Sequence, residues 1–199
     1  MIDSIRASLR EGAEALANLI ADRAAIEAID RASEVLAGAF RSGGRVISCG
    51  NGGSMCDAMH LAEELSGRFR KERPALAAAA VSDPGHLSCA ANDYGYERAF
   101  ARWIEAHGRA GDVLVAISTS GRSSNVIAAA HAARSRGMQV VALTGRRGSD
   151  LGALAHVEIC TPAGRWSDRI QELHIKVIHI LIETVERRLF PENYRDEEA

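Results

Sequence analysis

The sequence predicts an α/β fold in which a three-layer, doubly wound sheet of five parallel strands is covered by helices, with two extra helices at the N-terminus. Five short aliphatic segments are predicted strands, and they cover residues 46–49, 75–81, 112–117, 139–144 and 156–161. Amphipathic helical segments separate most of these strands, and this alternation is typical of a parallel sheet covered on both faces. In addition, glycine-rich or hydroxyl-rich turns follow two strands, at the edge where such sheets bind ligands.

The composition fits one globular domain over residues 1–199. The chain has 47% hydrophobic and 25% charged residues, and its net charge of −2 offers no basic surplus for nucleic acid. No apolar run approaches the ~18 residues that span a bilayer, and the N-terminus lacks the order of a signal peptide. We therefore expect a cytoplasmic protein with no nucleic-acid or membrane partner.

The cysteines indicate neither a disulfide framework nor a thiolate zinc site. Cys49, Cys56, Cys89 and Cys160 are scattered, and no C-x-x-C motif is present. We expect them to fill the core as small apolar residues.

Two amphipathic helices precede the first strand. Apolar residues recur at steps of three or four over residues 2–22 and again over 22–40, and a Gly43-Gly44 pair ends the second helix. Two helices before the first strand exceed what a minimal nucleotide-type fold requires. We expect both to pack against something beyond their own sheet.

The chain is organised around residues 45–64, RVISCGNGGSMCDAMHLAEE. A buried strand leads through a glycine-rich turn at 50–54 into a helix, whose free N–H groups and dipole suit a phosphate. His60 and Glu64 are four residues apart, so they share one helix face near that turn. The pattern is also compatible with an ordinary strand, turn and helix that carries a surface contact, and both interpretations stay open.

The next segment offers weaker signals. The basic cluster RFRKER at 68–73 is more typical of a solvated surface than of a nucleic-acid site. Small residues dominate the second predicted strand. Residues 82–96 are rich in turn formers and predict a loop, in which Asn92 and Asp93 are candidate ligand contacts and equally plausible turn residues.

A second candidate anion site follows the third predicted strand. The turn STSGRSSN at 118–125 holds more hydroxyl groups than a helix N-cap requires, which favours phosphate binding. Predicted helices at 124–136 and 149–154 separate the last three strands.

The last predicted helix covers residues 166–190. Its segment VIHILI is almost continuously apolar, which predicts burial on more than one side and a subunit interface. Gln171 and His179 lie on roughly one stripe of this helix, whereas His174 lies to the side, and a lone histidine in an apolar helix is often a core residue. We expect the polar tail at 191–199 to fray.

Together, the motifs SCGNGGS, CDAMHLAEEL, STSG, ANDYGY and DRIQELHIKVIHILIE resemble the phosphoheptose isomerases, the sedoheptulose 7-phosphate isomerases of the flavodoxin-like sugar-isomerase (SIS) fold. The similarity extends from the N-terminal helices to about Leu189. It implies a homotetramer with active sites at subunit interfaces, with residues 1–41 in the oligomer core, a sugar-phosphate substrate and one zinc per subunit. The activity it implies is conversion of D-sedoheptulose 7-phosphate to D-glycero-D-manno-heptose 7-phosphate, the first step of bacterial ADP-/GDP-heptose synthesis for lipopolysaccharide core.

The resemblance also implies the residues of the site. The substrate-binding residues are Asn51, Gly52, Gly53, Ser54, Glu64, Asn92, Asp93, Ser118, Thr119, Ser120, Ser123 and Gln171. The zinc ligands are His60, Glu64, Gln171 and His179. In the family, the residues matching Glu64 and His179 are regarded as catalytic base and acid.

The chemistry of these residues fits the implied reaction. Ketose–aldose isomerisation through an enediol needs a base that moves a proton between C1 and C2 and an acid that serves the oxygens, and a carboxylate and an imidazole supply both. Zinc takes nitrogen and oxygen ligands of this kind. Because zinc weakens a bound carboxylate as a base, the sequence leaves open whether zinc is catalytic or mainly orders the site. The alternative is a non-catalytic SIS-domain protein that binds a phosphosugar or associates with a replication initiator, and it has little need of these four side chains.

Overall fold

A computed structural model describes residues 1–197, and the sheet has the strand order β2-β1-β3-β4-β5 with every neighbouring pair parallel. The strands are β1 Val46–Gly50, β2 Ala78–Ala80, β3 Val113–Ser118, β4 Gln139–Thr144 and β5 Val157–Cys160. The five-stranded parallel sheet predicted from the sequence is therefore confirmed. β2 is shorter than predicted, and it is an edge strand that pairs with β1.

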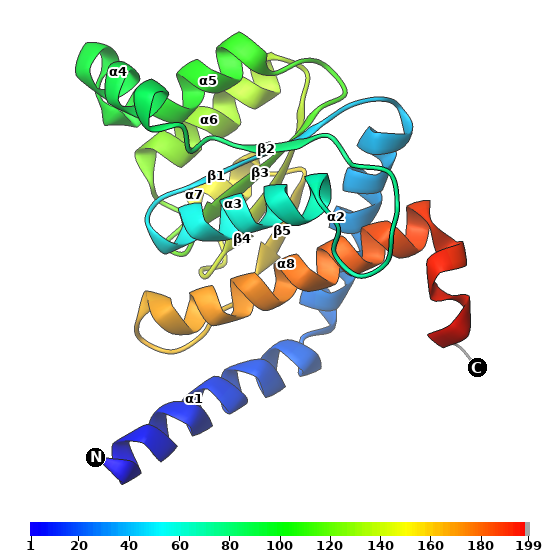
Figure 1. Cartoon of the computed structure of the whole chain (residues 1–199). Helices are drawn as coiled ribbons and strands as arrows, with labels where there is room; N and C mark the ends of the chain where they lie inside the picture. Colours follow the sequence, from blue (N-terminus) through cyan, green and yellow to red (C-terminus); the bar gives the residue numbers. More distant parts are fainter. Residues whose placement is uncertain (198–199) are drawn as a thin grey trace.

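The described helices cover both faces of this sheet (Figure 1). They are α1 Ile2–Ala21, α2 Arg23–Arg41, α3 Gly53–Ser66, α4 Pro84–Tyr94, α5 Ala99–His107, α6 Ser124–Ser135, α7 Asp150–Leu154 and α8 Ser167–Leu189, with 3₁₀ turns at Tyr96–Arg98 and Pro191–Glu197. Alternate residues of each strand face opposite sides. Accordingly, Val113 and Val115 pack with α2, α3 and α8, whereas Leu114 packs with α5, α6 and α7.

The prediction of a loop over residues 82–96 is wrong. Most of this segment is α4, which Asp83 caps by accepting a 2.7 Å hydrogen bond from the backbone N–H of His86. Pro84 occupies the first helical turn, where its missing N–H carries no cost. The Asp-Pro-Gly sequence is thus a helix start, although its composition is that of a turn.

The predicted burial of the segment VIHILI arises within the chain itself. α8 packs against α1, α2 and α3, and these contacts bury Val177, Ile178, Leu181 and Ile182. His179 and Ile180 remain exposed. The apolar run alone therefore does not require a subunit interface.

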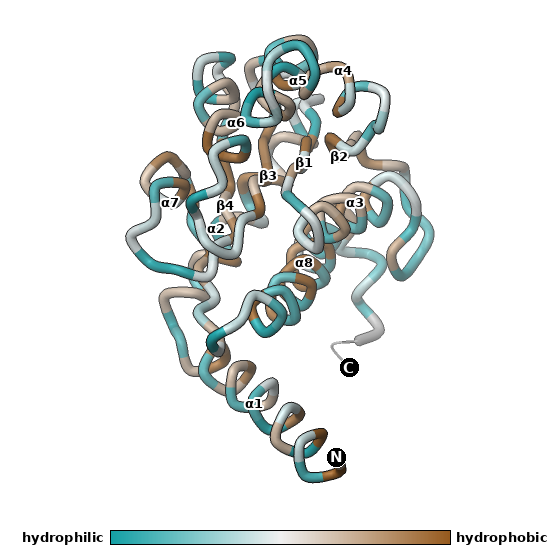
Figure 2. Tube along the Cα trace, turned by 90° about the vertical axis from the view of Figure 1, so that its left-hand side faces the viewer, coloured by the Kyte–Doolittle hydropathy of each residue, from teal (hydrophilic) through white to brown (hydrophobic). Residues whose placement is uncertain are grey.

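α1 lies apart from the sheet and extends away from the body of the molecule (Figures 1 and 2). It contacts α2 and α8, and Ile2, Ile5, Leu9 and Ile20 keep more than half of their surface exposed. Such an apolar helix face is typical of an interaction surface.

Two polar segments are more ordered than the sequence indicates. The basic cluster at 68–73 is not uniformly solvated, because Arg73 is 6% exposed. The predicted fraying of the tail is wrong for residues 191–197, because Tyr194 is 4% exposed and the side chain of Asn193 donates to the carbonyl of Glu72 at 3.0 Å, while residues 198–199 lie outside the described residues. Within the described residues, no helix combines the length and the apolar character needed to span a membrane.

Candidate active site

The glycine-rich turn joins β1 to α3 at the carboxyl edge of the sheet. Gly52 adopts a φ of +56°, which favours glycine. A Cβ at Gly50 would lie 2.6 Å from the carbonyl oxygen of Ser54, so the turn is tight as well. α3 begins at Gly53, and its free N–H groups and positive dipole end suit an anion.

The hydroxyl-rich turn follows β3, the neighbour of β1. Ser118 Oγ lies 3.0 Å from Ser123 Oγ and 3.5 Å from Ser120 Oγ. Ser123 is the N-cap residue of α6, yet its side chain makes no capping hydrogen bond. The hydroxyl groups therefore gather at the sheet edge instead of serving the helix.

An asparagine pair that the sequence analysis missed connects the two turns. Asn51 and Asn125 exchange side-chain hydrogen bonds of 2.9 and 2.8 Å, and the hydroxyl of Tyr96 donates to Asn51 Oδ1 at 3.1 Å. The two partners of Asn51 belong to motifs of the sequence, because Asn125 is the last residue of STSGRSSN and Tyr96 is the last residue of ANDYGY. Only the tertiary structure brings them to Asn51.

A cluster of imidazoles and carboxylates forms where α3 passes α8. His60 Nε2 lies 2.9 Å from His179 Nε2 and 3.6 Å from Glu64 Oε1. His60 Nδ1 lies 3.1 Å from Glu63 Oε1, a carboxylate that the sequence analysis did not select. Ligand atoms of His60, Glu63 and Glu64 lie within 4.8 Å of one another, so this group could hold a metal ion.

The electrostatics of the cluster favour a neutral imidazole at His179. Burial lowers the pKa of His179, and the adjacent His60 lowers it further, while Glu64 acts in the opposite direction. A neutral imidazole is the form that binds a metal or accepts a proton.

Gln171 and His174, the other two residues of α8 singled out from the sequence, lie in different surroundings. A Cβ on Gly53 would lie 2.7 Å from Gln171 Oε1, so the Gln171 amide rests on the first residue of α3. His174 is fully buried, its Nε2 lies 3.3 Å from the carbonyl of Thr144, and burial lowers its pKa to about 4. The structure therefore separates His174 from the cluster, as its position on the helix predicted.

Asn92 and Asp93 lie on the exposed last turn of α4. The Asn92 amide donates to Asp93 Oδ1 at 2.8 Å, and Cys89 lies 3.6 Å from Asp93 Oδ2. Among the described residues, no hydrogen bond joins this pair to either turn.

The fold and these two turns define the class of protein as a SIS domain, and the model of the SIS domain family matches residues 8–145. The phosphoheptose isomerase of Klebsiella pneumoniae subsp. pneumoniae is 57% identical over 187 residues, which cover 94% of this chain and 97% of that protein. A solved phosphoheptose isomerase from Neisseria gonorrhoeae superposes with a TM-score of 0.86 at 38% identity, covering 92% of this chain and 97% of that one. For the Francisella tularensis phosphoheptose isomerase, the TM-score is 0.88 at 31% identity, over 94% and 98% of the two chains. The chain therefore belongs to the phosphoheptose isomerases, and it is an enzyme.

Proposed function

We propose that this enzyme converts D-sedoheptulose 7-phosphate to D-glycero-D-manno-heptose 7-phosphate with the α3/α8 cluster as its catalytic centre. The observation that carries the proposal is the contact of α3 with α8, where His60 lies 2.9 Å from His179 and 3.6 Å from Glu64. The helix that carries His60 and Glu64 begins at the anion-receptive turn. The reaction supplies the first intermediate of bacterial ADP-/GDP-heptose and lipopolysaccharide core synthesis. We place the enzyme in the cytoplasm.

The two turns at the sheet edge bind the substrate. Backbone N–H groups at the start of α3 and the hydroxyls of Ser118 and Ser123 are suited to the phosphate. The Asn51–Asn125 pair holds the two turns together. The remaining substrate contacts that we propose are Gly52, Gly53, Ser54, Glu64, Asn92, Asp93, Thr119, Ser120 and Gln171.

Glu64 and His179 transfer the protons. Glu64 takes the proton from C1 of the ketose and returns it at C2, while His179 serves the O1 and O2 oxygens through the enediol. Their side chains come from two helices, and both lie close to His60 Nε2, His179 at 2.9 Å and Glu64 at 3.6 Å.

The donor set at this cluster fits zinc. His60, Glu64 and His179 of the cluster would hold it together with Gln171, which rests on Gly53 at the N-terminal end of α3, and the nitrogen and oxygen atoms of these residues are ligands that zinc accepts. When bound, zinc polarises sugar oxygens as a Lewis acid. Glu63, close to His60 Nδ1, favours the tautomer whose Nε2 lone pair faces His179.

We also propose a homotetramer with active sites at subunit interfaces and α1 and α2 in its core. Support comes from the exposed apolar side chains of α1, which include Ile5 and Leu9. A second copy of the chain would cover them.

The activity is tested by assaying heptose phosphate formation with and without a chelator. Glu64→Gln keeps the shape of the side chain but cannot accept the proton, so we expect turnover to vanish in a folded protein. Near-wild-type turnover in this variant would refute the role of Glu64. Product absent from the wild-type protein under both conditions, together with tight binding of a protein partner, would instead support the non-catalytic SIS alternative.

The metal site is tested by elemental analysis after zinc loading. His179→Ala should lose zinc, and the matched control His174→Ala should keep it, because His174 bonds to Thr144 away from the cluster. Equal loss in both variants, or in neither, would mean that the ligands are assigned wrongly.

A further inference from the structure

The helices α3 and α8, which carry the proposed catalytic residues, lie side by side (Figures 1 and 2), and the sequence colours of Figure 1 show that both run in the same direction. At their N-terminal ends, Gln171 rests on Gly53, and near the middle His60 meets His179. Beyond the cluster, both helices are joined to a third group, the guanidinium of Arg73. This residue belongs to the segment between α3 and β2 and is remote from the substrate turns.

Arg73 closes the C-terminal end of α3. The last four carbonyls of a helix lack partners within it, and Arg73 donates at 2.8 Å from Nη2 to the carbonyl of Glu64 and from Nη1 to that of Leu65. Nη1 also reaches the carbonyl of Gly67 at 2.9 Å and that of Pro74 at 3.3 Å. A cation at this position complements the helix dipole, and one of its acceptors is the backbone of the proposed base.

The remaining donor of Arg73 fixes this helix end to α8. Arg73 Nε lies 2.8 Å from Glu186 Oε1, and each side chain is 1% exposed. Glu186 follows His179 by seven residues, or about two helical turns. The ion pair therefore joins the part of α3 that carries Glu64 to the part of α8 that carries His179.

The C-terminal segment supplies the third member. The hydroxyl of Tyr194 donates to Glu186 Oε2 at 2.6 Å, so both carboxylate oxygens have partners. Burial raises the pKa of Tyr194 above its ordinary value, and its hydrogen bond to Glu186 adds to the increase. The hydroxyl thus remains a donor throughout the working pH range.

Stability alone is a weak explanation for this arrangement. Apolar residues of similar volume often replace a buried ion pair without loss, and sometimes with a gain, in stability. An apolar replacement would lack directional bonds, whereas the three guanidinium nitrogens of Arg73, in fixed geometry, donate to two carbonyls of α3 and to the Glu186 carboxylate of α8. Catalysis here depends on such placement, because an error of about 1 Å can cost about 100-fold in rate.

We propose that Arg73, Glu186 and Tyr194 form a buried clamp that positions His60 and Glu64 of α3 against His179 of α8, which makes them positioning residues for the isomerase. The inference rests on the proposed function of that cluster. It also makes the C-terminal segment part of the active-site framework.

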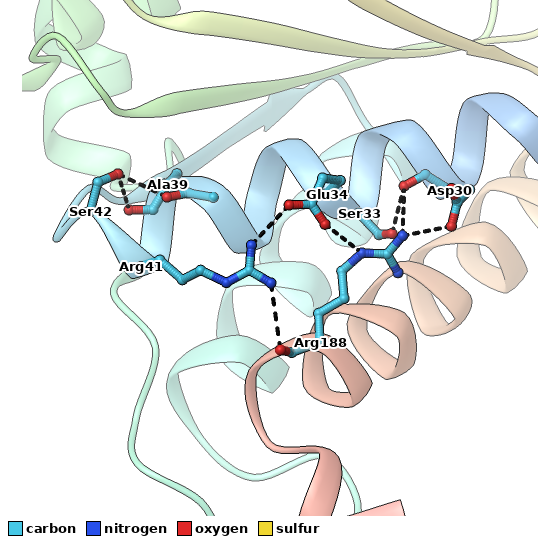
Figure 3. A network of polar contacts seen from close by, with 8 residues as sticks. Asp30, Ser33, Glu34, Ala39, Arg41, Ser42 and Arg188 are labelled. Atoms are coloured by element: carbon cyan, nitrogen blue, oxygen red, sulfur yellow. Dashed lines mark hydrogen bonds and ion pairs between the residues drawn. The ribbon is translucent and has the colours of Figure 1, made fainter.

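The test compares Arg73→Lys with Arg188→Lys in the full chain. Lysine keeps the buried charge but lacks the planar fork with which Nε, Nη1 and Nη2 of Arg73 reach Glu186, Leu65 and Glu64. Arg188 lies two residues after Glu186 on the same helix and pairs with Asp30 and Glu34 of α2 at 2.6 and 2.8 Å (Figure 3). It is a more exposed ion pair that joins α8 to α2, and among the described residues it has no hydrogen bond to α3.

We expect Arg73→Lys to lower kcat about 10- to 100-fold and to weaken zinc binding measured by competition with a chromophoric chelator, with a smaller change in KM. Tyr194→Phe, which removes a single hydroxyl, should change both quantities in the same direction but less. Arg188→Lys should leave them unchanged.

A merely structural role would lower the melting temperature of Arg73→Lys while kcat and zinc affinity at 25 °C stayed at wild-type values, and that result would overturn the clamp. If Arg73→Lys does not fold, wild-type kcat and zinc affinity in Tyr194→Phe would overturn it. His179→Ala separates the two proposals. If His179→Ala retains zinc, the cluster is not the zinc site and the proposed function fails. If His179→Ala loses zinc while the clamp variants keep wild-type kcat and zinc affinity, only the clamp is refuted.

Discussion

Replacing His174 should remove a component of the pH dependence of stability. Its ring is fully buried in α8, its Nδ1 has no hydrogen-bond partner among the described residues, and Nε2 lies 3.3 Å from the carbonyl of Thr144. Burial therefore favours the neutral ring and lowers the pKa from 6.5 to about 4, with the Thr144 hydrogen bond acting in the opposite direction.

The sign follows from which state binds the proton first. Above pH 6.5 His174 is neutral in both states, and its contribution to stability is fully present. As the pH falls from 6.5 toward 4, the unfolded chain takes up the proton before the folded one, so stability is lost. At about 1.4 kcal/mol per pH unit, the loss approaches about 3 kcal/mol at the low end of this range.

The assay is urea denaturation followed by tryptophan fluorescence at fixed protein concentration, at about pH 7 and about pH 4. His174→Gln keeps a donor near Thr144 but does not titrate, so the free energy of unfolding should fall less on acidification than in the wild type, by about 2–3 kcal/mol. Other titrating groups cancel in this comparison. Equal acid sensitivity of the two proteins would refute the reasoning.

Three further changes test other parts of the structure. Gly53→Ala should displace the Gln171 amide, because the added Cβ would lie 2.7 Å from its oxygen. We expect zinc binding to weaken about 10-fold in a chelator titration, and undiminished zinc affinity would exclude Gln171 as a ligand. Asn125→Ala removes both hydrogen bonds to Asn51 and should raise KM about 10-fold, and an unchanged KM would mean that the turns hold together without it. Leu9→Glu charges the exposed face of α1 and should shift the light-scattering mass to a smaller species, so an unchanged mass would place α1 outside the interface.

The sheet was predictable because its strands are short aliphatic runs. The predicted strand at 112–117 and β3 at Val113–Ser118 differ by one residue at each end. α4 and α5 were not predicted. The start of α4 has the composition of a turn, and its helical state depends on the Asp83 cap and on packing against α5, where His86 Nε2 lies 2.9 Å from the carbonyl of Ala99.

Within the site, local relations were predictable and long-range relations were not. His60 and Glu64 share a face because of helix geometry, and the structure brings them within 3.6 Å. The link from Asn51 to Asn125 spans 74 positions, and the ion pair from Arg73 to Glu186 spans 113. Contacts of this kind follow from the crossover connections of the sheet, so sequence spacing cannot reveal them.

The buried seam between α3 and α8 explains why the cluster forms where it does. Leu61 and Leu65 on α3 and Ile178 on α8 are fully buried in one core cluster. His60 and Glu64 each immediately precede one of these leucines, and each residue along a helix turns about 100° from the last. The polar side chains therefore lie at the solvent margin of a seam that core packing holds in place. The active site that we propose at this margin gains fixed helix spacing from the core, while the side chains that we propose as reacting groups stay accessible to a substrate.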